Sequence, residues 1–291
     1  MKQCWILIVL CCLGCQKRDI KTIVVRGSDT EVNLVLMLAE SYMNTHPDVS
    51  IAVTGGGSGT GIAALINKRT DIANSSREFK SEEMKLAKDR NVAVTPIIFA
   101  VDALSFIVNE SSIIDSLSLT QARDIYTGKI TNWTAIGGED QEISLYGRQS
   151  NSGTFTFIQE HILKGDYSLH MKQMNGTSQI IENIKNDRAG IGYVGIGYII
   201  NKEGNLIEGI KVLKIYSEDQ HKAITPVNPD NIYNGSYPIV RPLYQYLDGK
   251  PNDELKNFIL YELSPEGQKI ISENGYFPIT EANKTINSKC L

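Results

Sequence analysis

The most informative stretch of the sequence is VSIAVTGGGSGTGIAALIN, residues 49–67. It begins with a β-branched strand at 49–53, continues through a glycine- and hydroxyl-rich loop at 55–61, and ends in a helical pattern from 62 to 67. A strand joined to a helix by a short loop is the unit of a parallel α/β sheet. The helix N-terminus carries free N–H groups and a positive dipole end, and glycine lets the backbone approach a ligand closely. The loop therefore predicts an oxyanion-binding site.

The same unit occurs on both sides of this stretch. A strand at 22–25 runs into Gly-Ser-Asp-Thr at 27–30, where Ser28, Asp29 and Thr30 are each plausible helix N-caps. A third strand at 71–73 ends at Asn-Ser-Ser-Arg, 74–77, before another helix. Ligands of parallel sheets bind outside the carboxyl ends of the strands. We therefore expect three ligand-facing loops along one sheet edge.

The second half of the chain repeats this organisation. The β-rich run 92–108 is too long for one typical strand and is predicted to cross into a second α/β domain. The extended segment 237–247 is predicted to be the return crossing. The remaining elements expected are helices at 120–126, 153–163, 253–263 and 266–273 and strands at 143–146 and 191–194.

A second loop of the glycine and hydroxyl type, Arg-Gln-Ser-Asn-Ser-Gly-Thr at 148–154, precedes the helix predicted at 153–163. Two such loops about ninety residues apart predict an anion held from two sides. Arg148 can supply a bidentate, charge-assisted pair, and Arg77 is a second guanidinium candidate. The alternative for either arginine is a solvated surface charge. Hydroxyl groups expected at the site belong to Ser28, Thr30, Ser58, Thr60, Ser75, Ser76, Ser152 and Thr154.

The composition and the N-terminus restrict the function further. The formal net charge of −4 over 291 residues gives no broad attraction to nucleic acid, so nucleic-acid binding is not expected. Residues 4–13 form an apolar run too short to span a membrane, and Leu-Gly-Cys follows at 13–15. The pattern resembles a lipoprotein signal peptide, 1–15, with Cys15 acylated, although Cys12 stands where that motif usually carries leucine. The alternative is an ordinary signal peptide.

The chain offers no evident catalytic or metal-binding set. After cleavage only Cys15 and Cys290 would remain of the five cysteines, and the four histidines have no zinc-like spacing. The loop at 57–61 is neither a P-loop nor the dinucleotide fingerprint, and Ser58 and Ser152 lack the nucleophile-elbow motif. We therefore expect a binding protein, not an enzyme, with no cofactor and no metal.

At these residues the chain resembles the phosphate-binding component of bacterial ABC importers, the PstS family, over nearly the whole mature length. The motifs that carry the resemblance are Gly-Ser-Asp-Thr at 27–30, the glycine loop at 55–61, Asp-Ile-Ala-Asn-Ser-Ser-Arg at 71–77, Val-Asp-Ala-Leu-Ser-Phe-Ile-Val-Asn at 101–109, Ile-Tyr-Thr-Gly-Lys-Ile-Thr-Asn-Trp at 125–133, Gly-Arg-Gln-Ser-Asn-Ser-Gly-Thr at 147–154, Ile-Gly-Tyr-Val-Gly at 191–195 and Tyr-Pro-Ile-Val-Arg-Pro-Leu-Tyr at 237–244.

The resemblance implies an α/β, type II periplasmic-binding-protein fold whose two domains close on inorganic phosphate. The expected domains are 20–102 plus 246–291 and, inserted between them, 103–245. The implied phosphate contacts are Asp29, Thr30, Ser58, Gly59, Arg148, Ser152, Gly153 and Thr154, to which the loop chemistry adds Ser76 and Arg77. Some members of the family carry at the position of Ser76 an aspartate that accepts the ligand's proton. In this chain Ser76 can accept without a charge, or Asp29 can supply the acceptor.

The expected role is an exported, lipid-anchored receptor that faces the periplasm or cell exterior. Its partners would be phosphate and the permease subunits of the importer; it would touch the membrane through the lipid alone and be a monomer. A second hypothesis is a binder or sensor of another tetrahedral oxyanion, such as sulfate, molybdate or arsenate. A third, from another class, is a secreted phosphatase that uses Ser58 or Ser152.

Overall fold

The N-terminal part of the chain, 21–89, forms a parallel sheet with helices on both faces. The computed structural model describes residues 20–201, 203–216 and 221–291. Strand β1 pairs in parallel with β2 and with β3, which confirms the three predicted strands. These elements are β1 (Lys21–Gly27), α1 (Val32–Thr45), β2 (Val49–Thr54), α2 (Ser58–Ile66), β3 (Ile72–Ser75) and α3 (Ser81–Asp89).

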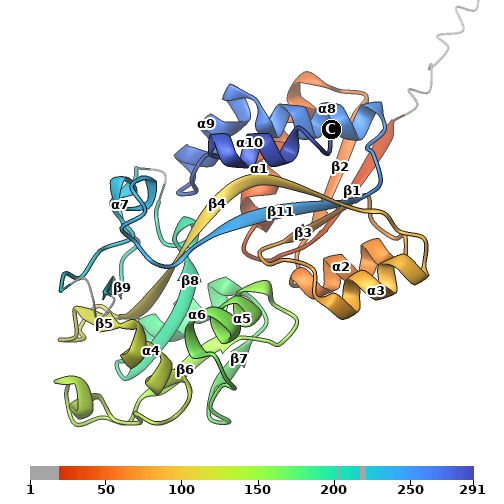
Figure 1. Ribbon diagram of the computed structural model, residues 1–291. Helices are drawn as coiled ribbons and strands as arrows, with labels where there is room; N and C mark the ends of the chain where they lie inside the picture. Colours follow the sequence, from red (N-terminus) through yellow and green to blue (C-terminus); the bar gives the residue numbers. More distant parts are fainter. Residues whose placement is uncertain (1–19, 202, 217–220) are drawn as a thin grey trace, which may run out of the picture.

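Two long strands connect this first lobe to a second one (Figure 1). Strand β4 (Val94–Asn109) pairs antiparallel with β11 (Val240–Asp248) through its first ten residues, 94–103. Its remaining residues, 104–109, pair with β8 and β9 of the second lobe. The run that is too long for a typical strand is therefore a single strand shared by both halves. In the described residues the sheet order is β2-β1-β3-β11-β4-β8-β6-β7, with β9 beside β4.

The second lobe repeats the α/β pattern with shorter elements. The segment expected to be a helix, 153–163, is helical throughout, but it is α-helical only to Ile158. It continues as a π-helix to Leu163 and ends before Lys164, where φ is 52°. A helix over 177–186 was not predicted. The elements are β5 (Ser116–Ser118), α4 (Leu119–Tyr126), η1 (Trp133–Ile136), β6 (Ser144–Arg148), α5 (Gly153–Ile158), η2 (Gln159–Leu163), β7 (Lys172–Met174), α6 (Thr177–Asn186), β8 (Gly190–Gly195), η3 (Ile196–Tyr198), β9 (Ile210–Val212), β10 (Lys214–Tyr216) and α7 (Pro229–Tyr233).

The C-terminal helices return to the first lobe, as Figure 1 shows. They are α8 (Asp253–Leu263), α9 (Pro265–Glu273) and α10 (Glu281–Asn287), of which the first two match the predicted closing helices. Asn252 and Ser264 cap α8 and α9 by accepting backbone N–H groups. The Asn287 amide bonds to both the N–H and the carbonyl of Ile98, at 2.9 and 2.7 Å, and so fastens α10 to β4.

Each lobe buries apolar side chains of its own. In the first lobe, one cluster lies between the sheet and α1, α8 and α9, and another lies beneath α2 and α3 on the opposite face. A larger cluster fills the second lobe around Phe106, Tyr126 and Ile191. Because burial of apolar area is the main stabilising term, each lobe has the core that a separately packed unit requires.

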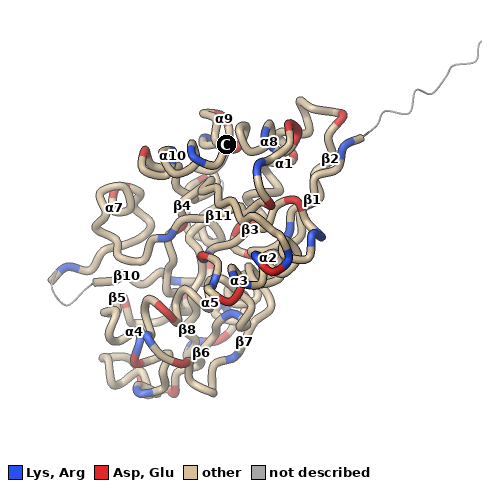
Figure 2. Tube along the Cα trace, turned by 45° about the vertical axis from the view of Figure 1, so that its right-hand side comes forward, with Lys and Arg blue, Asp and Glu red and all other residues tan. Residues whose placement is uncertain are grey.

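The distribution of charge and the lengths of the helices can be compared with the predictions from composition and from the N-terminal sequence. Figure 2 shows Lys and Arg interspersed with Asp and Glu along the described trace, without a broad face of one sign. None of the helices in the described ranges has the length and apolar character needed to cross a membrane. Cys15 and the predicted signal peptide lie outside the described residues.

Candidate oxyanion-binding site between the lobes

The glycine loop after β2 places the start of α2 at the gap between the lobes. Gly56 and Gly57 have φ of 121° and 99°, which L side chains rarely adopt. A Cβ at Gly57 would also lie 2.9 Å from the Asn151 carbonyl oxygen in the opposite lobe. Only glycine therefore allows this turn and this approach. The Ser58 N–H, at the first position of α2, makes no hydrogen bond to any residue that the structure describes.

The loop after β6 presents the start of α5 from the other side. The expectation that this helix start is uncapped is wrong for two donors, because the Ser152 hydroxyl accepts the N–H groups of Thr154 and Phe155, at 3.2 and 3.4 Å. The N–H of Gly153 has no acceptor in the described part of the chain. One backbone donor at each helix start thus remains for a ligand.

These two loops contact each other directly. The Gly59 N–H donates to the Asn151 carbonyl at 2.9 Å, and the Asn151 amide donates to the Gly56 carbonyl at 3.0 Å. Gly153 lies against the first lobe so closely that an added Cβ would be 2.3 Å from Ser58 Oγ and 2.5 Å from Ser76 Oγ. The structure therefore brings Ser58, Gly59, Ser152 and Gly153 together, from segments ninety residues apart.

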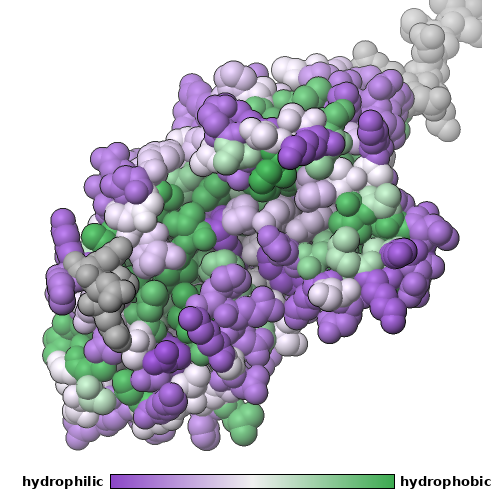
Figure 3. All heavy atoms as spheres, in the orientation of Figure 1, coloured by the Kyte–Doolittle hydropathy of each residue, from purple (hydrophilic) through white to green (hydrophobic). Residues whose placement is uncertain are grey.

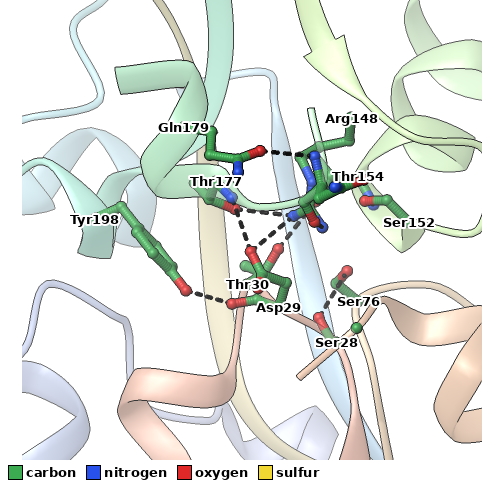
Figure 4. Close-up of polar contacts among 12 residues, drawn as sticks. Ser28, Asp29, Thr30, Ser76, Arg148, Ser152, Thr154, Thr177, Gln179 and Tyr198 are labelled. Atoms are coloured by element: carbon green, nitrogen blue, oxygen red, sulfur yellow. Dashed lines mark hydrogen bonds and ion pairs between the residues drawn. The ribbon is translucent and has the colours of Figure 1, made fainter. Parts of the chain in front are cut away.

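A cluster of hydroxyl groups surrounds this contact (Figure 4). Ser28 Oγ donates to Ser76 Oγ at 3.2 Å, and Ser58 Oγ lies 3.4 Å from the same atom. Thr30 Oγ1 and Thr154 Oγ1 are 2.9 Å apart across the gap. All five side chains are buried. Hydroxyl groups can reorient to donate, so the cluster can supply several hydrogen bonds to one small anion.

Arg148 is buried beside this cluster, at 1% exposure of its side chain. Its Nη1 donates to Asp29 Oδ2 at 3.0 Å and to Thr177 Oγ1 at 2.9 Å, and its Nη2 donates to the Asn175 carbonyl at 2.9 Å. Its Nε has no partner among the described residues. Burial lowers the pKa of Arg148, and the nearby Asp29 carboxylate opposes that shift. A desolvated guanidinium with an unused donor is suited to bind an oxyanion.

Asp29 connects the two lobes. The N-cap prediction for Ser28, Asp29 and Thr30 is wrong, because Glu31 occupies the N-cap of α1 and makes no side-chain cap bond. Asp29 Oδ2 instead accepts the Thr177 N–H at 2.8 Å, at the start of α6 in the other lobe. The Tyr198 hydroxyl donates to the Asp29 carbonyl (Figure 4). The carboxylate is therefore already bound to two donors, Arg148 and Thr177.

The structure does not bring Arg77 into the cluster. Its two terminal nitrogens bind the Glu83 carboxylate at 2.8 and 2.7 Å, and one of them also donates to the Glu78 carbonyl. Hydrogen bonds from Arg77 and from the Lys80 N–H lower the pKa of Glu83 against the opposing effect of burial. Arg77 thus holds the start of α3 in place.

Sequence reasoning missed a second buried arginine at the site, Arg241 on β11, together with Asp102 on β4. The signal that could have found them is a charged residue within an apolar, extended run: Asp102 in 97–108 and Arg241 in 237–247. A charge at such a position is buried and needs a partner. The contribution of Thr177 from the unpredicted helix α6 was missed as well.

The chemistry of this site is that of binding. Within the described residues, no group of three or more His, Cys, Asp or Glu side chains could hold a metal ion. The Ser152 hydroxyl is engaged by backbone N–H groups, and Ser58 contacts Ser76. In the part of the chain that the structure describes, His46 and His161 bond to atoms of their own helical segments and not to either serine. The site thus presents several hydrogen-bond donors to an anion.

Comparison with known proteins identifies relatives over most of the chain. The model of the PBP superfamily domain matches residues 16–266. The phosphate-binding protein PstS of Pseudomonas aeruginosa is 30% identical over 271 residues, covering 87% of this chain and 81% of that protein. PstS of Bacillus subtilis is 28% identical and covers 91% and 83%. Both relatives are named as phosphate-binding proteins.

A solved structure also supports the similarity to phosphate-binding proteins. A putative phosphate ABC transporter substrate-binding protein with bound phosphate from Clostridium perfringens is 27% identical, with a TM-score of 0.78, and covers 89% of this chain and 100% of its own. The mixed α/β fold predicted from the sequence is confirmed as the periplasmic-binding-protein fold. From the matched length and these relatives, the chain belongs to the PBP superfamily domain family, among whose members it is similar to the PstS phosphate-binding proteins.

Proposed function

We propose that this chain is an extracytoplasmic solute-binding protein that captures inorganic phosphate between its lobes and delivers it to an ABC importer. The observation that carries the proposal is the meeting of the α2 and α5 starts, each with an unused N–H, beside the buried Arg148. Backbone donors at a helix start, hydroxyl groups and a guanidinium are the donors that bind a phosphate group. The named relatives bind the same ligand.

The proposed contacts are the backbone donors of Ser58 and Gly153, the hydroxyls of Thr30, Ser58, Ser76, Ser152 and Thr154, and the guanidinium of Arg148. Gly59 takes part indirectly, because its N–H donates to the Asn151 carbonyl and so holds the two loops together. Asp29 takes part through Arg148, because its carboxylate balances that charge. Arg77 is omitted because its guanidinium is bound to Glu83. A five-atom ligand gains at most about 7–8 kcal/mol in such a site, which corresponds to a dissociation constant near micromolar.

We propose that the chain has two domains, 20–102 plus 246–291 and, inserted between them, 103–245. The crossing of β4 and β11 and the separate apolar cores support this division. The two antiparallel strands are the connection about which closure would occur. We further propose that the protein acts as a monomer, without catalysis, cofactor or metal, and delivers phosphate to permease subunits.

Ligand identity is tested by isothermal titration of the purified protein with phosphate and with sulfate. Ser76 can accept the proton of hydrogen phosphate, but its uncharged hydroxyl can also reorient to donate to sulfate, so the comparison of the two affinities measures the selectivity of the site. Saturable heat with phosphate supports the proposal. Absence of heat at millimolar phosphate would overturn it, and equal affinity for sulfate would favour a general oxyanion binder or sensor.

We also propose that Cys15 is acylated and that residues 1–15 are removed, so that the lipid anchors the exported protein to the membrane. The support is the sequence pattern at 4–15 and an extracytoplasmic family. Metabolic labelling with a fatty acid analogue tests the anchor: the label should be incorporated and should be lost in Cys15→Ser. A label that persists in the variant would contradict this assignment.

A further inference from the structure

Arg241 and Asp102 form a buried ion pair on the two strands that join the lobes. The residues are direct partners in the antiparallel register of β11 and β4. Asp102 Oδ2 accepts Arg241 Nη2 at 2.9 Å and Nε at 3.1 Å, and the exposed fractions of the side chains are 1% and 0%. A buried pair is weak evidence for stability, since desolvation offsets most of the attraction. Its position therefore calls for a functional reason.

The Arg241 guanidinium contacts three loops of the oxyanion site, through Thr30, Ser76 and Thr154. Nη2 lies 3.3 Å from Thr30 Oγ1 in the first lobe and 3.0 Å from Thr154 Oγ1 in the second. Nη1 donates to the Ser76 carbonyl at 3.2 Å. The two threonines are the pair that meet across the gap. Arg241 thus contacts the loops that the ligand would have to touch.

The guanidinium also has donor capacity and a route to solvent. Of its two Nη1 hydrogens, one is given to Ser76, and the other has no acceptor in the described residues. A cavity of about 670 Å³ is lined by Ser76, Arg241 and Phe157, among others, and the Phe157 ring lies 5.5 Å from the guanidinium carbon. Figure 3 shows this face hollowed between the lobe of α2 and α3 and the lobe of α5.

We propose that Arg241 is a second phosphate-binding residue, held by Asp102 so that its Nη1 and Nη2 edge faces the ligand from the strands that join the lobes. This inference rests on the proposed function. Since β4 and β11 belong to both lobes, a guanidinium on them keeps its position while the loops on either side approach. A fixed donor lowers the cost of ordering the site around phosphate.

Asp102 has a separate role in this arrangement. Its Oδ1 has no partner among the described residues, so it contacts Arg241 through Oδ2 alone. Burial raises the pKa of Asp102, and the attraction of Arg241 opposes that shift. Through its contact with the guanidinium, the Asp102 carboxylate balances Arg241 and partly reduces its attraction for an anion.

Substitutions can distinguish a ligand-binding Arg241 from a purely structural ion pair. Loss of either partner breaks the ion pair, but only loss of Arg241 removes a donor to phosphate. Asp102→Asn keeps an oxygen acceptor for Arg241 and removes the opposing charge. Arg241→Gln with Asp102→Asn removes both charges and leaves a neutral, hydrogen-bonding pair. A merely structural pair predicts that both variants lose phosphate affinity alike. A ligand-binding Arg241 predicts that affinity falls in the double variant but not in Asp102→Asn.

The experiment is isothermal titration of the purified protein with inorganic phosphate. The control is Arg69→Gln, which removes one positive charge from an exposed side chain that makes no hydrogen bond or ion pair among the described residues. We expect the Arg241→Gln, Asp102→Asn double variant to bind phosphate at least about tenfold more weakly, because a charge-assisted bond is lost. Asp102→Asn alone should bind as tightly as the wild type or roughly several-fold more tightly. Arg69→Gln should be unchanged.

Arg241→Lys is included in case the double variant does not fold. It keeps the charge beside Asp102 but lacks the fork that reaches both the carboxylate and the ligand, so its affinity should also fall. Wild-type affinity in either Arg241 variant, or an equal loss in Asp102→Asn and the double variant, would overturn the role of Arg241. If the wild type itself gives no heat with phosphate, the proposed function fails.

Discussion

Gly153→Ala tests the contact between the two helix starts. A Cβ at this position would lie 2.3 Å from Ser58 Oγ and 2.5 Å from Ser76 Oγ, against about 3.5 Å for an ordinary contact. The backbone of Gly153 is outside the positive-φ region, and it is the first residue of α5, so alanine is acceptable within its own lobe. The added methyl group therefore interferes with the approach of the other lobe.

The expected size of the effect follows from this overlap. Overpacking of a closely packed contact costs about 1–3 kcal/mol, which corresponds to about 5–150-fold in the dissociation constant. We expect Gly153→Ala to weaken phosphate binding by that factor in isothermal titration. The melting temperature of the free protein should change much less, because the second lobe keeps its own core.

Gly165→Ala is the matched control. Gly165 lies in the same lobe, is exposed, and would place a Cβ no closer than 3.9 Å to its nearest neighbour, the Leu163 carbonyl oxygen. Its phosphate affinity should equal that of the wild type. Unchanged affinity in Gly153→Ala would show that the two loops do not approach each other in the bound protein, and our reasoning about closure would be wrong.

Three further predictions concern the Arg148 guanidinium, the buried carboxyl group of Glu262 and the close approach of Gly61 to the backbone. Arg148→Ala should weaken phosphate binding more than tenfold in the same titration, because a buried charge-assisted pair is worth about 1.5–3 kcal/mol; wild-type affinity would place the arginine away from the ligand. Burial raises the pKa of Glu262 to about 8 from 4.5, so the folded protein keeps a proton that the unfolded chain releases. Stability should therefore fall by up to about 1.4 kcal/mol per pH unit between about pH 4.5 and 8, and denaturant titrations should give a flatter profile for Glu262→Gln but not for the exposed Glu40→Gln. Gly61→Ala should lower the melting temperature, because a Cβ there would lie 2.4 Å from the Arg26 carbonyl oxygen beneath α2; an unchanged value would contradict that packing.

The order of strands, glycine-rich loops and helices could be predicted because each element is indicated by residues close to it in the sequence. The glycines at 55–61 and the Ser-Gly-Thr at 152–154 predict helices that begin within a few residues of them. Helix α6 also had a local signal, the helical spacing of Ile180, Ile181 and Ile184, which was overlooked.

The partners of the charged residues could not be predicted in the same way. Asp102 and Arg241 are 139 residues apart, and their pairing depends on the register of two strands. The sequence predicts Asp29 as an N-cap for the helix that follows it, but its carboxylate accepts the N–H of Thr177, which is 148 residues away. Arg77 and Arg148 looked equivalent in sequence, and only the structure shows Glu83 bound to the first of them.

The most direct test of the account is a crystal structure of the protein with phosphate bound. We predict one phosphate ion between the lobes, with its oxygens within about 2.7–3.2 Å of the backbone nitrogens of Ser58 and Gly153 and within reach of the Arg148 guanidinium. A phosphate ion held by one lobe alone, or located away from Arg148, would contradict the central claim that the two loops close on a shared ligand.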